Sequence, residues 1–388
     1  MKNKAIALLL AFISVSGMSK LSSQDPDVLN AIQTVVPFLT IAPDSRSGAM
    51  GDAGVATSPD IFSMHWNPSK FAFIDGKGGV GISYSPWLRN LVPDIDIAYL
   101  SGYSRIDSRQ VISGSLLYSS LGDVVFTDEY GNMMQVFKAN EFSIDVGYSR
   151  LFSEKFSGGT AFRFIYSNLT GGYYSGGEAT KPGISFAADI SGYYQTDATL
   201  FSKDALFAFG VNFANIGSKM SYSDSQTSDF IPMTLRLGTS GTIDLDNFNQ
   251  LTLTIDLGKF LVPTPPVYNA DMEIVAGKDP NVSVPVAIFR SFYDAPGGFK
   301  EEMREITYSF GTEYWYNNQF AIRAGYFHEH QTKGNRKYFT AGAGFKLKGF
   351  TIDFSYLMPR TNNHPLARTL RFSLSFDINS MRNVSSPT

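Results

Sequence analysis

The stretch Leu370-Arg-Phe-Ser-Leu-Ser-Phe-Asp-Ile378 places a large apolar side chain at every second position, with arginine, serine and aspartate between them. Successive side chains of a β-strand point to opposite faces, so this stretch predicts a strand with one apolar and one polar face. The same alternation recurs in residues 140–150, 249–260 and 349–357. A period of two, repeated along the chain, predicts an all-β fold.

Fourteen segments carry this alternation, and most match the roughly 9–11 residues that a tilted strand needs to cross a bilayer. An even number of antiparallel strands can close into a barrel, which leaves no unpaired edge in lipid. The segments are residues 78–85, 95–104, 110–119, 140–150, 156–168, 182–197, 204–214, 231–242, 249–260, 304–316, 319–329, 337–347, 349–357 and 367–378.

The connections between these segments alternate in length. Those after odd-numbered segments are long, up to 261–303, and those after even-numbered segments are short, such as Asn317-Asn318, where asparagine tolerates the positive φ of a tight hairpin. Long external loops and short periplasmic turns are typical of outer-membrane barrels. We therefore expect a 14-stranded antiparallel transmembrane β-barrel in the bacterial outer membrane, with extracellular loops and both chain ends in the periplasm. A soluble β-sandwich also alternates, but it would not need long loops at one end only.

The composition excludes several other classes of protein. Hydrophobic residues make up 43 % of the chain and the net charge is only −3, whereas disorder needs low hydrophobicity and high net charge. The chain has no cysteine, which excludes disulfide scaffolds and cysteine-based metal sites. The near-neutral charge gives no global field for holding nucleic acid, so we expect no nucleic-acid partner.

The N-terminal region divides into two parts that do not alternate. Basic Lys2 and Lys4, an apolar run over 5–15 and small residues after it predict a signal peptide over 1–23, whose cleavage site stays open between Ser19 and Gln24. A membrane anchor is the alternative, but the apolar run is too short to span a bilayer. Residues 24–77 then predict a compact plug, or hatch, inside the barrel, because their small residues allow close backbone packing. The barrel follows over 78–378, and 379–388 form a short periplasmic tail.

The polar faces of the predicted strands carry charges that should face the lumen, because a charge on the lipid side costs about 2–4 kcal/mol at the bilayer midplane. Their mixed signs predict ion pairs that hold the interior together, while a role for some of them along a transport path stays open. These residues are Glu141, Asp145, Arg163, Asp189, Arg236, Asp256, Glu313, Arg323, Asp353 and Arg371.

The stretch 47–56, Ser-Gly-Ala-Met-Gly-Asp-Ala-Gly-Val-Ala, with Trp66-Asn-Pro-Ser69, resembles the N-terminal hatch of the FadL-type barrels, which have 14 strands. Its motif residues are Gly48, Met50, Gly51, Asp52, Asn67 and Pro68. More narrowly, the chain resembles the PorV family of the type IX secretion system. The pieces that carry this resemblance lie in residues 37–46, 84–91, 213–217, 297–302, 323–329, 334–339 and 370–374.

This resemblance implies a function without catalysis and without a cofactor. Members of the family hold the C-terminal signal domain of secreted cargo at the cell surface and carry it from the translocon to an attachment complex. That complex contains the sortase PorU and the proteins PorQ and PorZ. The rival interpretation is a FadL-type channel that imports hydrophobic small molecules, and the charged lumen argues only mildly against it.

The connection 261–303 is the most informative loop, since so long a connection in a compact protein is usually functional or disordered. Its apolar residues, which include Phe289, Phe292 and Tyr293, predict either a cap over the barrel mouth or a protein-docking patch, and both can hold together. In the loop after the first strand, Trp87, Leu88 and Leu91 could extend this patch.

Other chemistry finds little support in the sequence. His328 and His330 could share a face, but no third ligand is apparent, so we expect no metal site. An outer-membrane hydrolase would need a reactive serine with histidine and acid partners, and no such set stands out.

Overall fold

The computed structural model describes residues 29–378, with gaps at 89–93, 128–129, 170, 173, 176–177, 225–227, 361–364 and 368. The predicted signal peptide (1–23), the predicted tail (379–388) and Leu91 lie outside the described residues. Within the described part of the chain, no helix is both long and apolar enough to cross a membrane.

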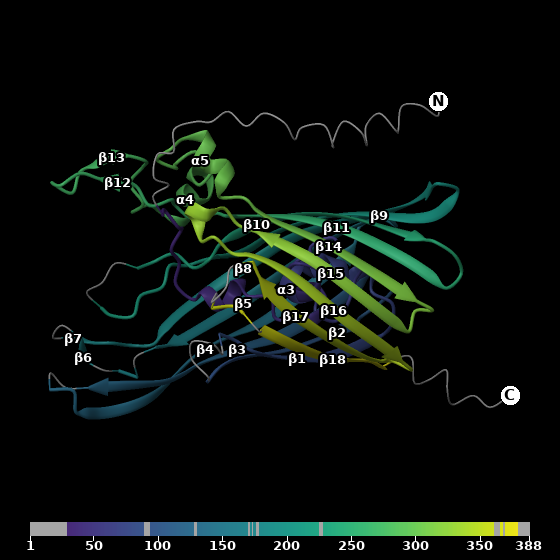
Figure 1. The fold of residues 1–388 in the computed structure, drawn as a ribbon, viewed down its shortest axis with the longest axis horizontal. Coiled ribbons are helices and arrows are strands. Elements are labelled where there is room, and N and C mark those ends of the chain that lie inside the picture. The colour runs from purple at the N-terminus through teal and green to yellow at the C-terminus, as the bar shows by residue number, and fades with distance from the viewer. Residues whose placement is uncertain are drawn as a thin grey trace.

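Fourteen antiparallel strands close into a barrel, which confirms the predicted fold class (Figure 1). The ring closes where the first strand pairs with the last, with Ile82 opposite Leu374. The barrel strands are β1 (Gly78–Pro86), β2 (Ile95–Arg105), β3 (Gln110–Thr127), β4 (Met133–Leu151), β5 (Phe156–Asn168), β8 (Gly183–Leu200), β9 (Lys203–Gly217), β10 (Thr234–Asp244), β11 (Asn249–Phe260), β14 (Thr307–Tyr316), β15 (Phe320–His328), β16 (Lys337–Leu347), β17 (Phe350–Pro359) and β18 (Thr369–Asp377).

The alternation of the sequence becomes an exposed apolar wall and a buried polar lining. On β18, Phe372 and Leu374 are exposed, whereas Arg371 and Ser373 between them are buried. On β4, Ile144 and Val146 are exposed, whereas Asp145 is buried. The wall therefore presents its apolar side chains to lipid and its charges to the lumen.

Two rims bound the barrel, which we call the long-loop rim and the short-turn rim. The short-turn rim carries tight connections such as Asn317 (φ 52°) and Asn318 (φ 50°), which take the left-handed backbone that the sequence predicted for them. The β8–β9 turn uses Phe201 and Ser202 in the same way, with φ of 52° and 64°.

The predicted loop 120–139 is wrong, because β3 and β4 continue well beyond the wall as a two-stranded ribbon. A register shift after Ser120, with Gly122 at φ 79°, interrupts the alternation on β3 at this point. A bulge of this kind adds one unpaired residue and moves the side chains to the opposite face, so the period of two breaks although the strand goes on.

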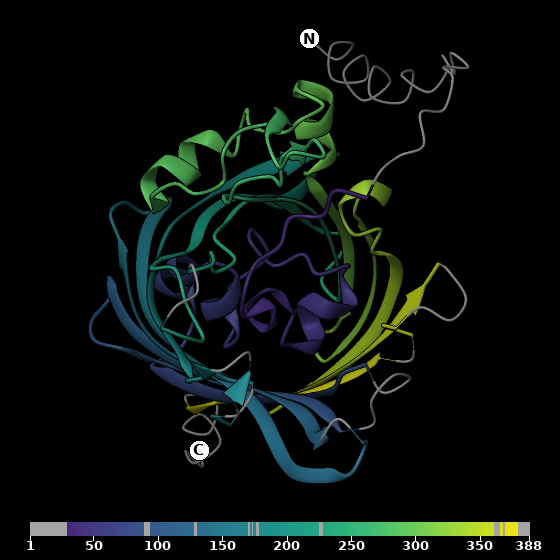
Figure 2. The ribbon, with the colours of Figure 1, turned by 90° about the vertical axis from the view of Figure 1, so that its left-hand side faces the viewer.

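The remaining described elements lie in the lumen or on the long-loop rim. The hatch, residues 37–73 in the structure, fills the lumen as short helices (Figure 2). They are η1 (Pro37–Thr40), α2 (Ser45–Ala49), α3 (Ser63–Trp66) and η2 (Pro68–Phe73). The connection between β11 and β14, residues 261–306, forms what we call the cap. It contains β12 (Val267–Tyr268), β13 (Ile274–Ala276), α4 (Val284–Arg290) and α5 (Phe299–Arg304), and the other long loops carry β6 (Tyr174–Ser175), β7 (Glu178–Ala179) and η3 (Gln331–Lys333).

The first described residues lie at the long-loop rim, whereas the chain ends, which were predicted to lie in the periplasm, fall outside the described residues. The Asn30 N–H donates to the carbonyl of Thr332 in the β15–β16 loop, and its side-chain amide donates to Pro265 in the cap. Residues 29–36 therefore enter the barrel from the long-loop rim, whereas β18 ends at the short-turn rim (Figure 1). The lengths of the loops predict at which rim each barrel strand ends. They do not predict the path of residues 29–36, which precede the first strand.

Candidate functional site

The lumen charges that the sequence predicted lie inside the barrel, and nine of the ten are buried, with Arg236 half-buried. Arg163 pairs with Asp145 at 2.7 Å and with Asp189 at 3.3 Å, which joins β4, β5 and β8 across the inner wall. Buried charges are tolerated only when they are paired and hydrogen-bonded. The sequence predicted that lumen charges of opposite sign would form ion pairs and hold the interior together, and this pairing across neighbouring strands has that role.

Glu313 on β14 links the wall to the hatch. It accepts from Arg46 of α2 at 2.8 and 3.0 Å and from Arg323 of β15 at 2.6 Å. Arg46 also reaches Asp60 within the hatch at 2.9 Å, and Arg323 reaches Asp353 on β17 at 2.7 Å. A single buried carboxylate is therefore shared by one hatch cation and one wall cation.

A second carboxylate holds the backbone of the hatch. Asp256 on β11 accepts from the N–H groups of Gly54 and Val55 at 2.7 and 2.8 Å. Inside the hatch, Asn67 donates to the carbonyls of Val55 and, across to the wall, Gly192 at 3.0 and 3.1 Å.

Wall hydroxyl groups complete the attachment, and the sequence analysis missed them. Each of several serines and threonines on the inner face donates to a hatch carbonyl: Ser101 to Ile61, Ser149 to Pro68, Ser157 to Ser69, Ser240 to Ala56 and Thr340 to Ala49, at 2.6 to 2.8 Å. The sequence does show small hydroxyl residues at lumen-facing positions. However, such residues also occupy the polar face of any alternating strand, so their pattern does not predict contact with a hatch. Only the position of the hatch distinguishes these residues.

The hatch contacts all 14 barrel strands. At Gly325 on β15 the contact is between backbones, because a Cβ atom there would lie 2.1 Å from the Gly51 nitrogen. Gly51 itself has φ 70°, which favours glycine. Backbone-to-backbone packing of this kind leaves no room for a side chain at the seam.

Three further hatch motif residues, Gly48, Met50 and Asp52, lie against the strands from β14 to β18. A Cβ atom on Gly48 would meet Arg371 of β18 at 2.8 Å, and Met50 is fully buried. Asp52 accepts a hydrogen bond from the hydroxyl of Tyr338. Arg371 is the least paired of the lumen charges: its nitrogens have no hydrogen-bond partner among the described residues, and its closest carboxylate is Asp52 at 3.9 Å.

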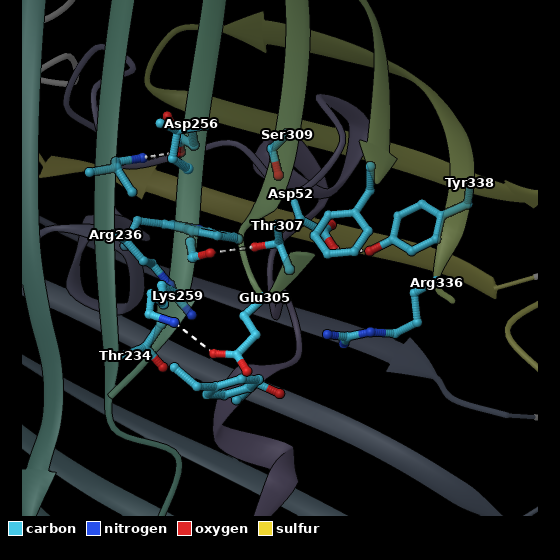
Figure 3. A pocket seen from close by; sticks show the side chains of 17 residues that line it. Asp52, Thr234, Arg236, Asp256, Lys259, Glu305, Thr307, Ser309, Arg336 and Tyr338 are labelled. Carbon is cyan, nitrogen blue, oxygen red and sulfur yellow. Dashed lines mark hydrogen bonds and ion pairs between the residues drawn. The ribbon is translucent and has the colours of Figure 1, made fainter. Parts of the chain in front are cut away.

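A small cavity of about 80 Å³ lies where the hatch, the wall and the cap meet (Figure 3). Arg236 and Lys259 approach it from the wall, Asp52 from the hatch and Glu305 from the cap. Arg236 donates to the carbonyl of His65 at 3.2 Å. The lining is mixed, since apolar side chains such as Val55, Trp66 and Phe327 lie beside the charged ones, and the cavity is far smaller than the roughly 300–1,000 Å³ of typical ligand pockets.

Buried ion pairs clamp the cap onto the long-loop rim. Lys259 at the end of β11 contacts Glu302 and Glu305 at 2.9 and 2.7 Å. Lys333 of η3 contacts Glu305 at 3.0 Å and Glu301 at 2.6 Å. Burial away from water, together with nearby Glu302, raises the pKa of Asp294 in this cluster from 3.8 to about 6.

The apolar residues of the cap separate into a buried set, which covers the barrel mouth as predicted, and an exposed set, for which a protein-docking role stays a prediction. Ala287 is buried, and Val284 and Ile288 pack against the hydrophobic cluster that lies between the cap and η1. Phe289, Phe292 and Tyr293 point away from this cluster and are 72 %, 47 % and 58 % exposed. Phe299 on α5, at 79 %, adds to them. We call the exposed set Phe289, Phe292, Tyr293 and Phe299 the aromatic patch.

Trp87 and Leu88 do not extend the aromatic patch. Both are half-buried and pack against inner hydrophobic clusters, and the Trp87 ring lies 5.6 Å from the Arg371 guanidinium. Their apolar character therefore reflects packing over the lumen.

His328 and His330, which the sequence analysis considered as metal ligands, make local contacts. His330 caps η3, its Nδ1 accepting from the Thr332 N–H at 3.3 Å, and His328 lies beside the Tyr326 hydroxyl at 3.3 Å. In the part of the chain that the structure describes, no group of three or more His, Asp and Glu side chains could hold a metal ion.

A closed 14-stranded barrel with an apolar exterior and an internal hatch defines an outer-membrane protein with a FadL-like fold. Its fold is similar to that of the toluene transporter TodX of Pseudomonas putida, with a TM-score of 0.50 and 12 % sequence identity over 90 % of this chain and 98 % of that one. A Pseudomonas aeruginosa FadL homologue gives a TM-score of 0.42 at 10 % identity over 91 % of this chain and 100 % of that one. A family model narrows the assignment: the chain belongs to the family of the type IX secretion system protein PorV, whose model matches residues 23–267. No curated protein matches the chain.

Proposed function

We propose that this protein is a non-enzymatic carrier of the type IX secretion system. It binds the C-terminal signal domain of secreted cargo at the cell surface and carries it from the translocon to the attachment complex with the sortase PorU and the proteins PorQ and PorZ. In this proposal the long-loop rim faces outward and the short-turn rim faces the periplasm. Membership of the PorV family supports secretion-system partners in general, and the named ones are part of the proposal.

The observation that carries this proposal is the aromatic patch on a rigidly clamped cap. Exposed aromatic residues grouped on one surface are typical of protein-docking sites. The ion pairs of Lys259 and Lys333 fix the cap before any partner binds, so docking costs little loop ordering.

The test is capture of a purified cargo signal domain by the detergent-solubilised protein. Phe289→Asp combined with Tyr293→Asp should weaken binding by about 30-fold or more, since removal of two central aromatic contacts costs about 2 kcal/mol or more. Phe201→Asp is the matched control, because Phe201 is 83 % exposed on the opposite rim and should not affect capture. Unchanged capture by the double variant would show that the cap is not the docking site.

The rival function is uptake of hydrophobic small molecules, and the structurally similar TodX is a toluene transporter. The small volume of the cavity and the continuous contact of the hatch with the wall do not favour it in this chain. Rapid toluene uptake into liposomes containing the wild-type protein, above that of empty liposomes, would favour the channel over the carrier.

A further inference from the structure

Two cationic side chains lie on the outside of the barrel wall at the long-loop rim, where β15, β16 and β17 are neighbours. Lys337 is the first residue of β16 and stands opposite His328, the last residue of β15. Arg360 directly follows β17, and its N–H donates to the carbonyl of Lys337 at 3.0 Å. The three residues therefore lie at one height on adjacent strands. We call Lys337 and Arg360 the basic pair.

Both members of the basic pair lie on the lipid-facing side of the wall. Tyr338 points into the lumen, where its hydroxyl contacts the hatch, so Lys337 beside it in β16 points outward. On β17, Leu357 is buried and Met358 is exposed. Arg360 lies two positions beyond Met358 and is exposed as well, which places it on the same side of the strand.

The outward-facing row next to the basic pair is apolar. Phe339 on β16 and Met358 on β17 lie opposite each other, each two residues from a member of the pair, and both are exposed to lipid. Two residues of a strand span about 6.5 Å, and the headgroup region adds about 5–8 Å to each side of the hydrocarbon core. The basic pair therefore stands at the height of the lipid headgroups when this apolar row contacts acyl chains.

Tyrosines around His328 mark the same boundary. Tyr308 on β14 lies opposite His328, with ring centroids 6.3 Å apart. The hydroxyl of Tyr326, in the row below, lies 3.3 Å from the Nδ1 atom of His328. Tyrosine is enriched where a membrane protein passes from hydrocarbon to water, because its ring is apolar and its hydroxyl is polar. These contacts support the placement of the basic pair at the membrane surface.

The charges of the basic pair are not neutralised within the described part of the chain, where neither Lys337 nor Arg360 forms an ion pair. The strands β15, β16 and β17, which the structure describes in full, hold one carboxylate, Asp353, and it pairs with Arg323 in the lumen. The sequence that follows Arg360, residues 361–368, contains no acidic residue. Two cations so placed attract an anion that reaches the wall from the membrane.

We propose that Lys337 and Arg360 bind a phosphate of lipid A, the membrane anchor of lipopolysaccharide. Lysine and arginine both bind phosphate, and the acyl chains of a lipid held there would lie along Phe339 and Met358. The choice of lipid A over a phospholipid rests on the proposed function, in which the long-loop rim faces outward, because lipopolysaccharide lies in the outer leaflet. The wall thus has a specific lipid contact at this rim in addition to its apolar surface.

Native mass spectrometry of the full-length protein in detergent tests this, with purified lipid A as the probe. The wild-type protein should retain lipid A, and Lys337→Gln combined with Arg360→Gln should bind it about tenfold more weakly, because both cations that face the phosphate are gone. Lys346→Gln combined with Lys348→Gln is the matched control, since it removes two exposed charges at the short-turn end of β16 and should bind within about threefold of wild type. Equal weakening by the two double variants, or no retention by the wild-type protein, would overturn the site.

The source of the phosphate is tested with phosphatidylglycerol in place of lipid A. Binding as tight as that of lipid A, dependent on the same two residues, would overturn the assignment to lipopolysaccharide. Capture of the cargo signal domain without added lipid should be unchanged in Lys337→Gln combined with Arg360→Gln. Weaker capture would assign the basic pair to the protein partner and overturn the lipid proposal. Retention of lipid A by a wild-type protein that captures no cargo would overturn the carrier function and leave the lipid site intact.

Discussion

At the scale of single residues, Glu313 is the lumen position where a substitution should cost most, because its carboxylate pairs with the guanidinium groups of both Arg46 and Arg323. Replacing it with glutamine leaves Arg46 without its wall partner and weakens the pairing of Arg323. Removing one member of a buried ion pair costs about 3–5 kcal/mol. We therefore predict that Glu313→Gln lowers the free energy of unfolding by that amount, measured by urea titration in lipid vesicles.

Glu141→Gln is the control for this prediction. Glu141 is equally buried, but it accepts from the neutral Ser167 hydroxyl at 2.7 Å, which a glutamine oxygen can also do. Its change should be about 1 kcal/mol or less. If the two variants unfold at the same urea concentration, the shared carboxylate is not what attaches the hatch to the wall.

The element that invites a second prediction is the cap. The pKa of Asp294 lies at about 6 in the closed cap and near 3.8 when the cap opens, so the closed form binds a proton that the open form releases. The stabilisation is complete below about pH 4 and is lost as the pH rises through about 6. Local opening of residues 284–304 should therefore increase about tenfold from pH 5 to pH 7, after correction for intrinsic exchange.

Asp294→Asn separates this effect from other titrations in the cluster. The amide cannot titrate, so its cap should open equally at the two pH values, whereas the glutamates that contact Lys259 are unchanged. A pH dependence that persists in the variant would show that the Asp294 carboxyl is not its source.

Elements also show what the sequence could and could not predict. The fourteen strands could be predicted because the inner face of every barrel strand points into one lumen, so each strand alternates with a period of two. The turn at Asn317-Asn318 could be predicted because few residues other than asparagine and glycine accept positive φ. The extension of β3 and β4 was missed because the bulge at Gly122 shifts the pattern by one residue. The cap helices α4 and α5 have only seven and six residues, too few to show the repeating apolar pattern of a helix. The sequence therefore predicted only a general role for residues 261–303.

For the molecule as a whole, the ring of contacts between hatch and wall carries a functional consequence. The lumen charges were predictable from the cost of placing them in lipid, but their partners were not, because Arg46 and Glu313 are 267 residues apart in the chain. Together with the wall hydroxyl groups and the close packing contacts, these pairs attach the hatch to the whole wall. Because the hatch fills the lumen, a folded partner protein can bind only at the rims and their loops.

This closure makes a prediction about ion flow. In planar bilayers, the wild-type protein should give a current close to that of the bare membrane. Gly325→Ala should open a steady conductance, because a Cβ atom 2.1 Å from the Gly51 nitrogen must push the hatch backbone off β15. Gly192→Ala is the matched control, since its Cβ atom would meet only wall side chains, Val211 at 3.3 Å and Phe156 at 3.6 Å, and should leave the current at the wild-type level. If Gly325→Ala inserts as a folded barrel and conducts no more than wild type, the hatch moves without opening a path, and the seam at β15 is not part of the seal.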